Sequence, residues 1–321
     1  MVAGRTDDIA IAKRQIAAKW KCKDLGPITT FVGFQITRDR AARTMKIHQT
    51  SYVTRLLERF KLDKANPTQL PIPANTVLKL DPEEPLTGEN QLLQPIETTL
   101  YRQAVGCLLY LSNCTRLDIS YPVGQLARHM HNPRIHHLRL VKQVLRYLNG
   151  TQNLGIIYRH STDRKPNPYD LYADATWGSE SDRVSFQGWV IVRAGGAVIW
   201  TSQRQRSTAL SSMEAEFMAA SEAAKEALWL EKLNIELKDD ITEPPTLRND
   251  NSGAVTLIYD PKFHAKAKHI DTRYMFIRND LVAQNRLKVE YIPGVDQPAD
   301  ILTKQLPVDA MRKHMLTLGM R

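Results

Sequence analysis

The sequence predicts an α/β (α+β) protein in which a mixed β-sheet with helices packed on it follows a smaller α+β region. Three observations support this prediction. Strand-like and helix-like segments alternate after residue 168. A stretch at 151–168 that contains Lys165, Pro166 and Pro168 separates them from an upstream part. The 321 residues are enough for two domains. We therefore expect one region over 1–150 and a second over 165–321.

The upstream region is predicted from hydrophobic spacing and turn residues. In chain order we expect an amphipathic helix over 1–20 that buries one apolar stripe, two strands around a polar turn within 29–49, and a helix from Thr50. A Pro-containing excursion over 66–98 and two apolar helices, over 101–113 and 136–150, should follow. The N-terminal stripe consists of Ile9, Ala12, Ile16 and Trp20.

The downstream region is predicted in the same way. A strand is expected within 169–178, a hairpin around Gly195 and Gly196, and then an alanine-rich helix within 210–233. The remaining elements are a strand running into a helix within 245–259, a longer helix over 269–284, a strand over 286–292 and a short final helix over 297–306. This order fits a mixed sheet with packed helices.

Composition excludes several classes of protein. The hydrophobic content of 42% is that of an ordinary globular chain, and no run of about 18 apolar residues predicts a membrane span. The charged N-terminus does not resemble a secretory signal. Three cysteines without a C-x-x-C spacing argue against a disulfide framework or a structural zinc site. An intracellular location, cytoplasmic or nuclear, and no membrane partner are expected.

The charge of the chain favours nucleic acid as a partner. The formal net charge is +10, with a pI near 9.5. Three groups of basic residues could follow a phosphate backbone, the alternative being solvated basic surfaces. The predicted contacts are Arg139, Lys142 and Arg146 on one helix face, Arg204 and Arg206 after the hairpin, and Lys266, Lys268, His269 and Arg273 around a later helix.

The alanine-rich helix carries two glutamates with different expected roles. Ser211 and Glu214 fit the S-x-x-E capping box, in which each side chain satisfies a backbone N–H of the first turn. In helical projection Glu216 falls within the apolar stripe, while Glu214 points to nearly the opposite side. A buried carboxylate costs several kcal/mol unless a positive group or a metal ion pairs with it. Glu216 is therefore a candidate functional residue.

Three aspartates at element edges are its candidate partners. Asp174 lies in a strand, where aspartate is depleted, Asp250 ends a strand, and Asp300 begins the last helix. Taken alone, Asp250 could be a helix N-cap and Asp300 could complement a helix dipole. Four converging carboxylates would instead repel one another unless divalent cations neutralise them. Mg²⁺ prefers oxygen ligands, and two such ions can cleave a phosphodiester.

Several long motifs resemble a known family. "LYADATWG", "RNDNSGAV" and "YIPGVDQPADILTKQLP" resemble the C-terminal ribonuclease H domain of copia-type retrotransposon Pol polyproteins. "KDLGPITTFVGFQI", "YRQAVGCLLYLSNCTRLDISYPV" and "HHLRLVKQVLRYLNGT" resemble the tail of the reverse transcriptase and its connection in that family. The resemblance covers nearly the whole chain.

The resemblance implies a fold and an activity. It implies a ribonuclease H-like mixed five-stranded sheet with flanking helices at 165–321, and a truncated remnant of the reverse-transcriptase palm, thumb and connection at 1–150. Carried over residue by residue, the catalytic and metal-binding quartet is Asp174, Glu216, Asp250 and Asp300. The implied cofactor is a pair of Mg²⁺ ions, with Mn²⁺ as a substitute, and the implied reaction is cleavage of the RNA strand of RNA–DNA hybrids.

The same resemblance limits the expected activity. The family's Tyr-Val-Asp-Asp polymerase motif comes just before a stretch like the opening "MVAG", so we expect no polymerase active site and no reverse transcription by this chain alone. Other Pol segments are expected as further partners. Two alternatives stay open: a catalytically inactive nucleic-acid-binding remnant of a retrotransposon, and a domesticated interaction module.

Overall fold

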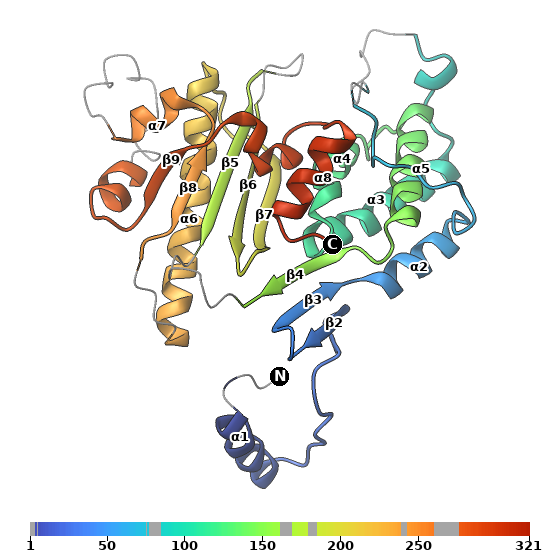
Figure 1. Ribbon diagram of the computed structural model, residues 1–321. Helices are drawn as coiled ribbons and strands as arrows, with labels where there is room; N and C mark the ends of the chain where they lie inside the picture. The colour runs from blue at the N-terminus through green and yellow to red at the C-terminus, as the bar shows by residue number, and fades with distance from the viewer. Residues whose placement is uncertain are drawn as a thin grey trace.

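The computed structural model describes residues 4, 6–74, 76, 85–160, 169–178, 185–238, 243–259 and 276–321. Within them the strands form two sheets (Figure 1). One sheet has four strands in the order β1-β2-β3-β4, and the other has five in the order β7-β6-β5-β8-β9. The predicted mixed sheet with packed helices is thereby confirmed.

The upstream elements follow the predicted order, with two additions that were not predicted: the short strand Thr30–Phe31 and the helix Ser120–Ala127. A strand hairpin precedes a helical layer in which α3, α4 and α5 pack around a core of buried leucines and valines. The bounds are α1 (Thr6–Lys19), β1 (Thr30–Phe31), β2 (Phe34–Asp39), β3 (Thr44–His48), α2 (Thr50–Arg59), η1 (Gly88–Asn90), α3 (Pro95–Cys114), η2 (Leu117–Ile119), α4 (Ser120–Ala127) and α5 (Ile135–Gly150).

The N-terminal helix forms, but the burial predicted for it is wrong. No residue of α1 is buried, and Trp20 is 63% exposed. Figure 1 shows α1 extending away from both sheets, so no other described element covers its apolar stripe. Helical periodicity predicts which face would be buried, but only a packing partner buries it.

The downstream elements build the five-stranded sheet. Their bounds are β5 (Asp170–Thr176), β6 (Phe186–Arg193), β7 (Gly196–Arg204), α6 (Ser212–Leu237), β8 (Thr246–Asn249), α7 (Ser252–Tyr259), the π-helical turn η5 (Ile277–Val282), β9 (Lys288–Tyr291), and the 3₁₀ turns η6 (Gly294–Asp296) and η7 (Pro298–Leu302). Most of the helix expected over 269–284 lies outside the described residues. The expected final helix is instead the short η7, and the unpredicted α8 (Val308–Thr317) follows it.

The five-stranded sheet is antiparallel on one side and parallel on the other. β5, β6 and β7 pair antiparallel, while β8 pairs parallel with β5 and β9 parallel with β8. The helix α6 packs against β5 and β6 through alanines such as Ala219, Ala220 and Ala223, which are fully buried and allow a close approach. No described helix is long and apolar enough to cross a membrane.

Besides the cores of the upstream helices and of α6 on the large sheet, a third core of buried apolar side chains, including Ile156, Val190 and Leu318, joins the two sheets. The strand β4 (Gly155–Arg159), which lies within the expected boundary 151–168, pairs with β3 and contributes Ile156 to this core. The chain end runs between the sheets, because Ile157 N donates to Gly319 O at 2.8 Å and Ala197 N donates to Leu318 O at 3.0 Å. Gly319 has φ +77°, and a Cβ there would lie 2.4 Å from Gly195 O, so only glycine fits.

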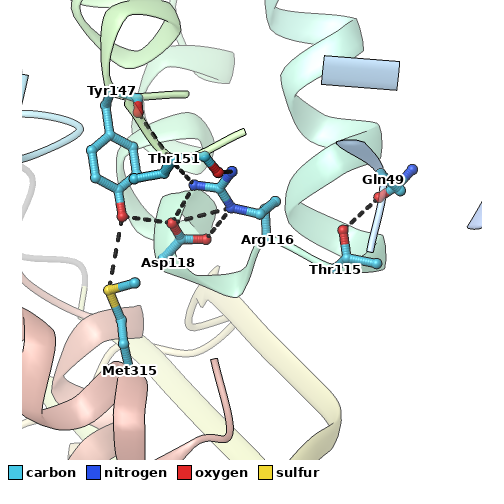
Figure 2. Close-up of polar contacts among 7 residues, drawn as sticks. All are labelled: Gln49, Thr115, Arg116, Asp118, Tyr147, Thr151 and Met315. Atoms are coloured by element: carbon cyan, nitrogen blue, oxygen red, sulfur yellow. Dashed lines mark hydrogen bonds and ion pairs between the residues drawn. The ribbon is translucent and has the colours of Figure 1, made fainter. Parts of the chain in front are cut away.

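A buried polar network supports the helices beside this junction (Figure 2). Arg116 and Asp118 form an ion pair at 2.7 Å with side chains 1% and 0% exposed. Two further side chains form hydrogen bonds with this ion pair. Tyr147 donates to Asp118 at 2.8 Å, and Arg116 donates to Thr151 Oγ1 at 2.7 Å. The Tyr147 hydroxyl also lies 3.8 Å from Met315 Sδ on α8, so the network extends to the C-terminal helix.

Loss of the Asp118 charge should destabilise the whole chain. In Asp118→Asn the Arg116 guanidinium stays buried without its counter-ion, and we expect a loss of about 3–5 kcal/mol in the free energy of unfolding. Tyr147→Phe removes one hydrogen bond and should cost about 1–2 kcal/mol. Urea denaturation followed by circular dichroism measures both. The exposed Asp63→Asn is the control, and an equal effect at Asp63 and Asp118 would contradict the assignment.

Candidate active site

The first turn of α6 fixes the position of Glu216. Ser211 is the N-cap and its Oγ accepts from Glu214 N at 3.2 Å, while Glu214 Oε2 accepts from Leu210 N at 2.7 Å. In a standard capping box the Glu214 side chain would accept from the N-cap residue, Ser211. Here it accepts from Leu210, one residue earlier. Glu214 is itself buried, which the helical projection did not predict, because α6 is covered on nearly all sides over its first turns.

Glu216 is held at the edge of the sheet by two donors. Its Oε1 accepts from Ala175 N at 3.1 Å, and its Oε2 accepts from Asn249 Nδ2 at 2.8 Å. Asn249 is fully buried at the end of β8 and also donates to Ala173 O at 3.0 Å. These bonds orient the carboxylate but leave it without a counter-charge of its own.

Asp174 lies in β5, and its side chain is directed to the face covered by η7. It is 2% exposed and accepts a hydrogen bond from Thr303 Oγ1. Its partner in the antiparallel ladder is Gly188. A Cβ at Gly188 would lie 2.5 Å from Leu302 Cβ, so glycine is needed there for η7 to approach the sheet beside Asp174.

Asp250 follows β8 and is half-buried. The N-cap function that its position suggested belongs to the next residue, since Asn251 Oδ1 accepts from Ala254 N at 3.0 Å. The Asp250 carboxylate therefore does not cap α7. It lies beside Gly294, where an added Cβ would be 3.1 Å from Asp250 Oδ2. The side chains of Asp174, Glu216 and Asp250 each offer an oxygen, and these oxygens lie within 4.8 Å of one another.

Asp300 joins this group through a lysine. It is 8% exposed in η7, and Lys304 Nζ lies 2.8 Å from Asp300 Oδ1 and 3.7 Å from Asp174 Oδ2. The i, i+4 spacing of Asp300 and Lys304 places both side chains on the same side of the chain as it leaves η7. One ammonium group therefore contacts two of the four carboxylates.

Crowding of carboxylates raises their pKa values. Burial, with the nearby Asp174 charge, raises the pKa of Glu216 well above its ordinary value and raises the pKa of Asp250 as well. The same two causes raise the pKa of Asp300 to about 7. Burial alone would lower the pKa of Lys304, but Asp174 and Asp300 raise it by more, so Lys304 stays charged. The cluster carries more negative charge than one lysine compensates.

The residues that support the carboxylates were not among the candidates predicted from the sequence. Lys304 follows Asp300 by four positions, and Thr303 and Asn249 adjoin other elements of the cluster. The i, i+4 spacing of Asp300 and Lys304 is a signal that was available in the sequence. Nothing in the local sequence marks Thr303 or Asn249, because their contacts come from strand β5 and helix α6.

The predicted nucleic-acid contacts lie in different places. Arg204 and Arg206 are exposed at the end of β7, and the register places Arg204 at the same edge of the sheet as Asp174. On α5, Lys142 is exposed, Arg139 pairs with Glu89, and Arg146 donates to Asn66 O at 2.7 Å. The remaining four, Lys266, Lys268, His269 and Arg273, lie outside the described residues.

Comparison with known proteins defines the class of the chain. The family described as "Reverse transcriptase (RNA-dependent DNA polymerase)" matches residues 1–74. The Retrovirus-related Pol polyprotein from transposon TNT 1-94 of Nicotiana tabacum is 36% identical over 302 residues, which are 93% of this chain and 22% of that protein. The transposon Ty5-1 protein of Saccharomyces cerevisiae is 30% identical over 70% of this chain and 73% of its own length.

The chain belongs to the family of copia-type retrotransposon Pol polyproteins. It spans about a fifth of the length of the longer curated relatives it matches. Among solved structures, LC11-RNase H1 in complex with RNA/DNA hybrid is similar with a TM-score of 0.30 and 19% identity, over 42% of this chain and 93% of that chain. The five-stranded sheet is mixed, with antiparallel and parallel strand pairs, as the sequence predicted.

The raised pKa of Asp300 predicts a pH dependence of stability without divalent ions. Between the ordinary aspartate pKa near 4 and its folded value of about 7, the folded state holds a proton that the unfolded state has lost. Stability should therefore fall as pH rises through this range. Asp300→Asn should match the parent near pH 4 and exceed its stability by a few kcal/mol near pH 7.5. Thermal unfolding in EDTA across this range provides the measurement, and a pH-independent difference would contradict the prediction.

Proposed function

We propose that this chain is a Mg²⁺-dependent endoribonuclease that cleaves the RNA strand of RNA–DNA hybrids. The observation that supports this most strongly is the convergence of oxygens from Asp174, Glu216 and Asp250 within 4.8 Å, with Asp300 beside them. Buried carboxylates without matching positive charge cost free energy, and a site that binds cations offsets that cost. The family of the chain supplies the nucleic-acid context.

The donor set fits a divalent cation of the Mg²⁺ type. Carboxylate oxygens are the ligands that Mg²⁺ prefers, and the cluster has no nitrogen or sulfur ligand among the described residues. Asp174, Glu216, Asp250 and Asp300 would hold two Mg²⁺ ions, and Mn²⁺ could replace them. When bound, such ions activate a water and stabilise the leaving oxygen of a phosphodiester.

The chain's own residues prepare the site. Ala175 N and Asn249 Nδ2 orient Glu216, and Thr303 orients Asp174, so two carboxylates are fixed in position by donors outside the cluster. The Lys304 ammonium contacts Asp174 and Asp300 and lowers their mutual repulsion. Arg204 and Arg206, exposed at the same edge of the sheet, are suitable phosphate contacts beside the site.

We extend the proposal to the organisation of the chain. Residues 165–321 form the ribonuclease H-like unit, and 1–150 form the reverse-transcriptase tail and connection that carries Arg139, Lys142 and Arg146 for nucleic-acid contact. Lys266, Lys268, His269 and Arg273 belong to the same proposed set. Recognition of the hybrid would depend on groove shape and 2′-OH contacts rather than on base sequence.

Hybrid cleavage tests the proposal directly. The purified 321-residue chain with Mg²⁺ should cut the labelled RNA strand of a hybrid and leave the DNA strand intact. Asp174→Asn should lower the rate by more than about 100-fold, because even residues that only support metal ligands cost 10–100-fold. Gel analysis of the labelled strand measures the rate.

The matched control is Asp170→Asn. Asp170 lies in the same strand, but it pairs with Arg248 at 2.7 Å and takes no part in the cluster. It should retain cleavage. If the folded parent protein cuts no hybrid in Mg²⁺ or Mn²⁺, the proposal is wrong and the reading of a catalytically inactive nucleic-acid-binding remnant replaces it.

The position of Lys304 leads us to expect a change in Mg²⁺ affinity that can be measured without cleavage. Its ammonium competes with a divalent ion for Asp174 and Asp300, so Lys304→Met should raise the Mg²⁺ affinity of the free protein several-fold. Isothermal titration calorimetry measures the affinity. Lys313→Met is the control, since Lys313 pairs with Asp296 on the surface. An unchanged or lower affinity in Lys304→Met would show that the lysine does not compete.

A further inference from the structure

Trp177 is exposed at the edge of the five-stranded sheet that carries the carboxylates. It directly follows β5, three residues after Asp174, and it is 51% exposed. At about 3.4 Å per residue, the Cα atoms of these two residues are no more than about 10 Å apart. The carboxylate chemistry proposed above gives no role to this large aromatic side chain.

The indole of Trp177 has a fixed orientation. Its Nε1 donates to Ala209 O at 2.9 Å, so the polar edge of the ring is bound to the segment between β7 and α6. A single exposed apolar side chain needs no explanation, but this one is exposed and oriented at the same time. A ligand that packs against it orders little on binding, because the ring has already lost its rotational freedom.

The ring and Glu216 belong to one frame of hydrogen bonds. Ala175 N, two residues before Trp177, donates to Glu216 Oε1 at 3.1 Å. The segment that accepts the indole's hydrogen bond is anchored to the same helix, since Gln205 Nε2 donates to Ala215 O at 2.8 Å. A group that rests on the ring is therefore held in a fixed position relative to the Glu216 carboxylate.

The side chains beside the ring are apolar and basic. Along the segment between β7 and α6, the buried Gln205 and Ala209 alternate with the exposed Arg206, Thr208 and Leu210. Leu210 adjoins the residue that accepts the indole's hydrogen bond. An oriented aromatic ring next to an apolar side chain and a cation is the composition of surfaces that bind a nucleic-acid strand.

Strand direction brings this surface to the carboxylate edge. β5 and β7 both run antiparallel to β6, so these two strands end at the same edge of the sheet. Thr176, the last residue of β5, and Arg204, the last residue of β7, both lie opposite Phe186. Trp177 and the segment after Arg204 therefore start from the edge at which Asp174 lies.

The shape of a paired duplex determines which of its groups a flat ring can reach. Neighbouring base pairs cover the base faces, while sugars line the wide, shallow minor groove of an A-form helix. Phosphates along one strand are spaced by about 3.4 Å, so a distance of about 10 Å corresponds to about three nucleotides. With a phosphate at the carboxylates, Trp177 lies beside sugars of the same strand.

We propose that Trp177, with Leu210 beside it, packs against ribose rings of the cleaved strand within about three nucleotides of the scissile phosphate. This inference rests on the proposed function and deepens it. Trp177 is then a positioning residue: it holds the strand by its sugars, so that one phosphate stays over the carboxylates. The contact is apolar and does not read base sequence.

Binding measured without cleavage tests the inference. The full chain carrying Asp174→Asn is titrated into a labelled RNA–DNA hybrid of about 20 base pairs, and anisotropy is followed from about 50 to 200 mM salt. Adding Trp177→Ala should weaken binding at least about fivefold. Trp177→Phe keeps a flat ring without the N–H group and should stay within about twofold of its parent.

Two further measurements separate an apolar contact from a structural role. Saturating hybrid should quench the tryptophan emission of the parent, and Trp177→Phe should lose most of that quenching. An apolar contact releases no counter-ions, so Trp177→Ala should leave the slope of log K against log salt unchanged, whereas Arg206→Gln should reduce it by about one.

Trp229 is the matched control. It is 53% exposed, as Trp177 is, but it lies on α6, which rises about 20 Å between Glu216 and Trp229. Trp229→Ala should leave hybrid affinity unchanged, and Trp229→Phe should retain the quenching. Circular dichroism checks that each variant is folded. If Trp177→Ala fails to fold, the emission of Trp177→Phe still decides.

Four results would overturn the inference. These are unchanged binding in Trp177→Ala, equal losses in Trp177→Ala and Trp229→Ala, a loss in Trp177→Phe as large as in Trp177→Ala, or quenching that Trp177→Phe retains. Any of them, in a chain that cleaves hybrid when Asp174 is intact, leaves the proposed function standing. Conversely, binding that depends on Trp177 in a chain that cleaves no hybrid rejects the proposed function and keeps the contact.

Discussion

The electrostatic constraint at one edge of the five-stranded sheet dominates this structure. Asp174, Glu216, Asp250 and Asp300 bring four acidic groups into a largely buried region, and Lys304 is the cation that contacts two of them. The fold keeps these groups together against their repulsion, which raises the pKa values of three of them. The arrangement lowers the stability of the fold, a cost that the proposed binding of cations would offset.

That arrangement depends on packing far from the acids. The turn η7, which carries Asp300, can approach β5 because Gly188 has no side chain to meet Leu302. Further along, the chain end passes between the sheets, where Gly319 fits against Gly195. The third core, in which Leu117 and Ile156 pack with Leu318, then fixes this C-terminal segment against the upstream region. The upstream region thus supports the position of a residue in the cluster.

Much of the fold followed from local patterns. The alternation within 170–176, the hairpin around residue 195 and the capped alanine-rich helix each form an element close to its predicted bounds. Where prediction was wrong, tertiary contacts were the cause. The amphipathic α1 has no cover, β4 forms within an expected boundary because β3 pairs with it, and α8 follows a segment expected to be the last helix.

The sequence by itself determined the four acidic candidates, since a carboxylate within an apolar helical stripe or strand conflicts with its surroundings wherever it folds. It also determined the family, through long ordered motifs. Only the tertiary structure decided that Lys304 lies between Asp174 and Asp300 and that Asn249 orients Glu216. These relations depend on strand register and on how segments distant in sequence pack together, and local spacing carries no information about either.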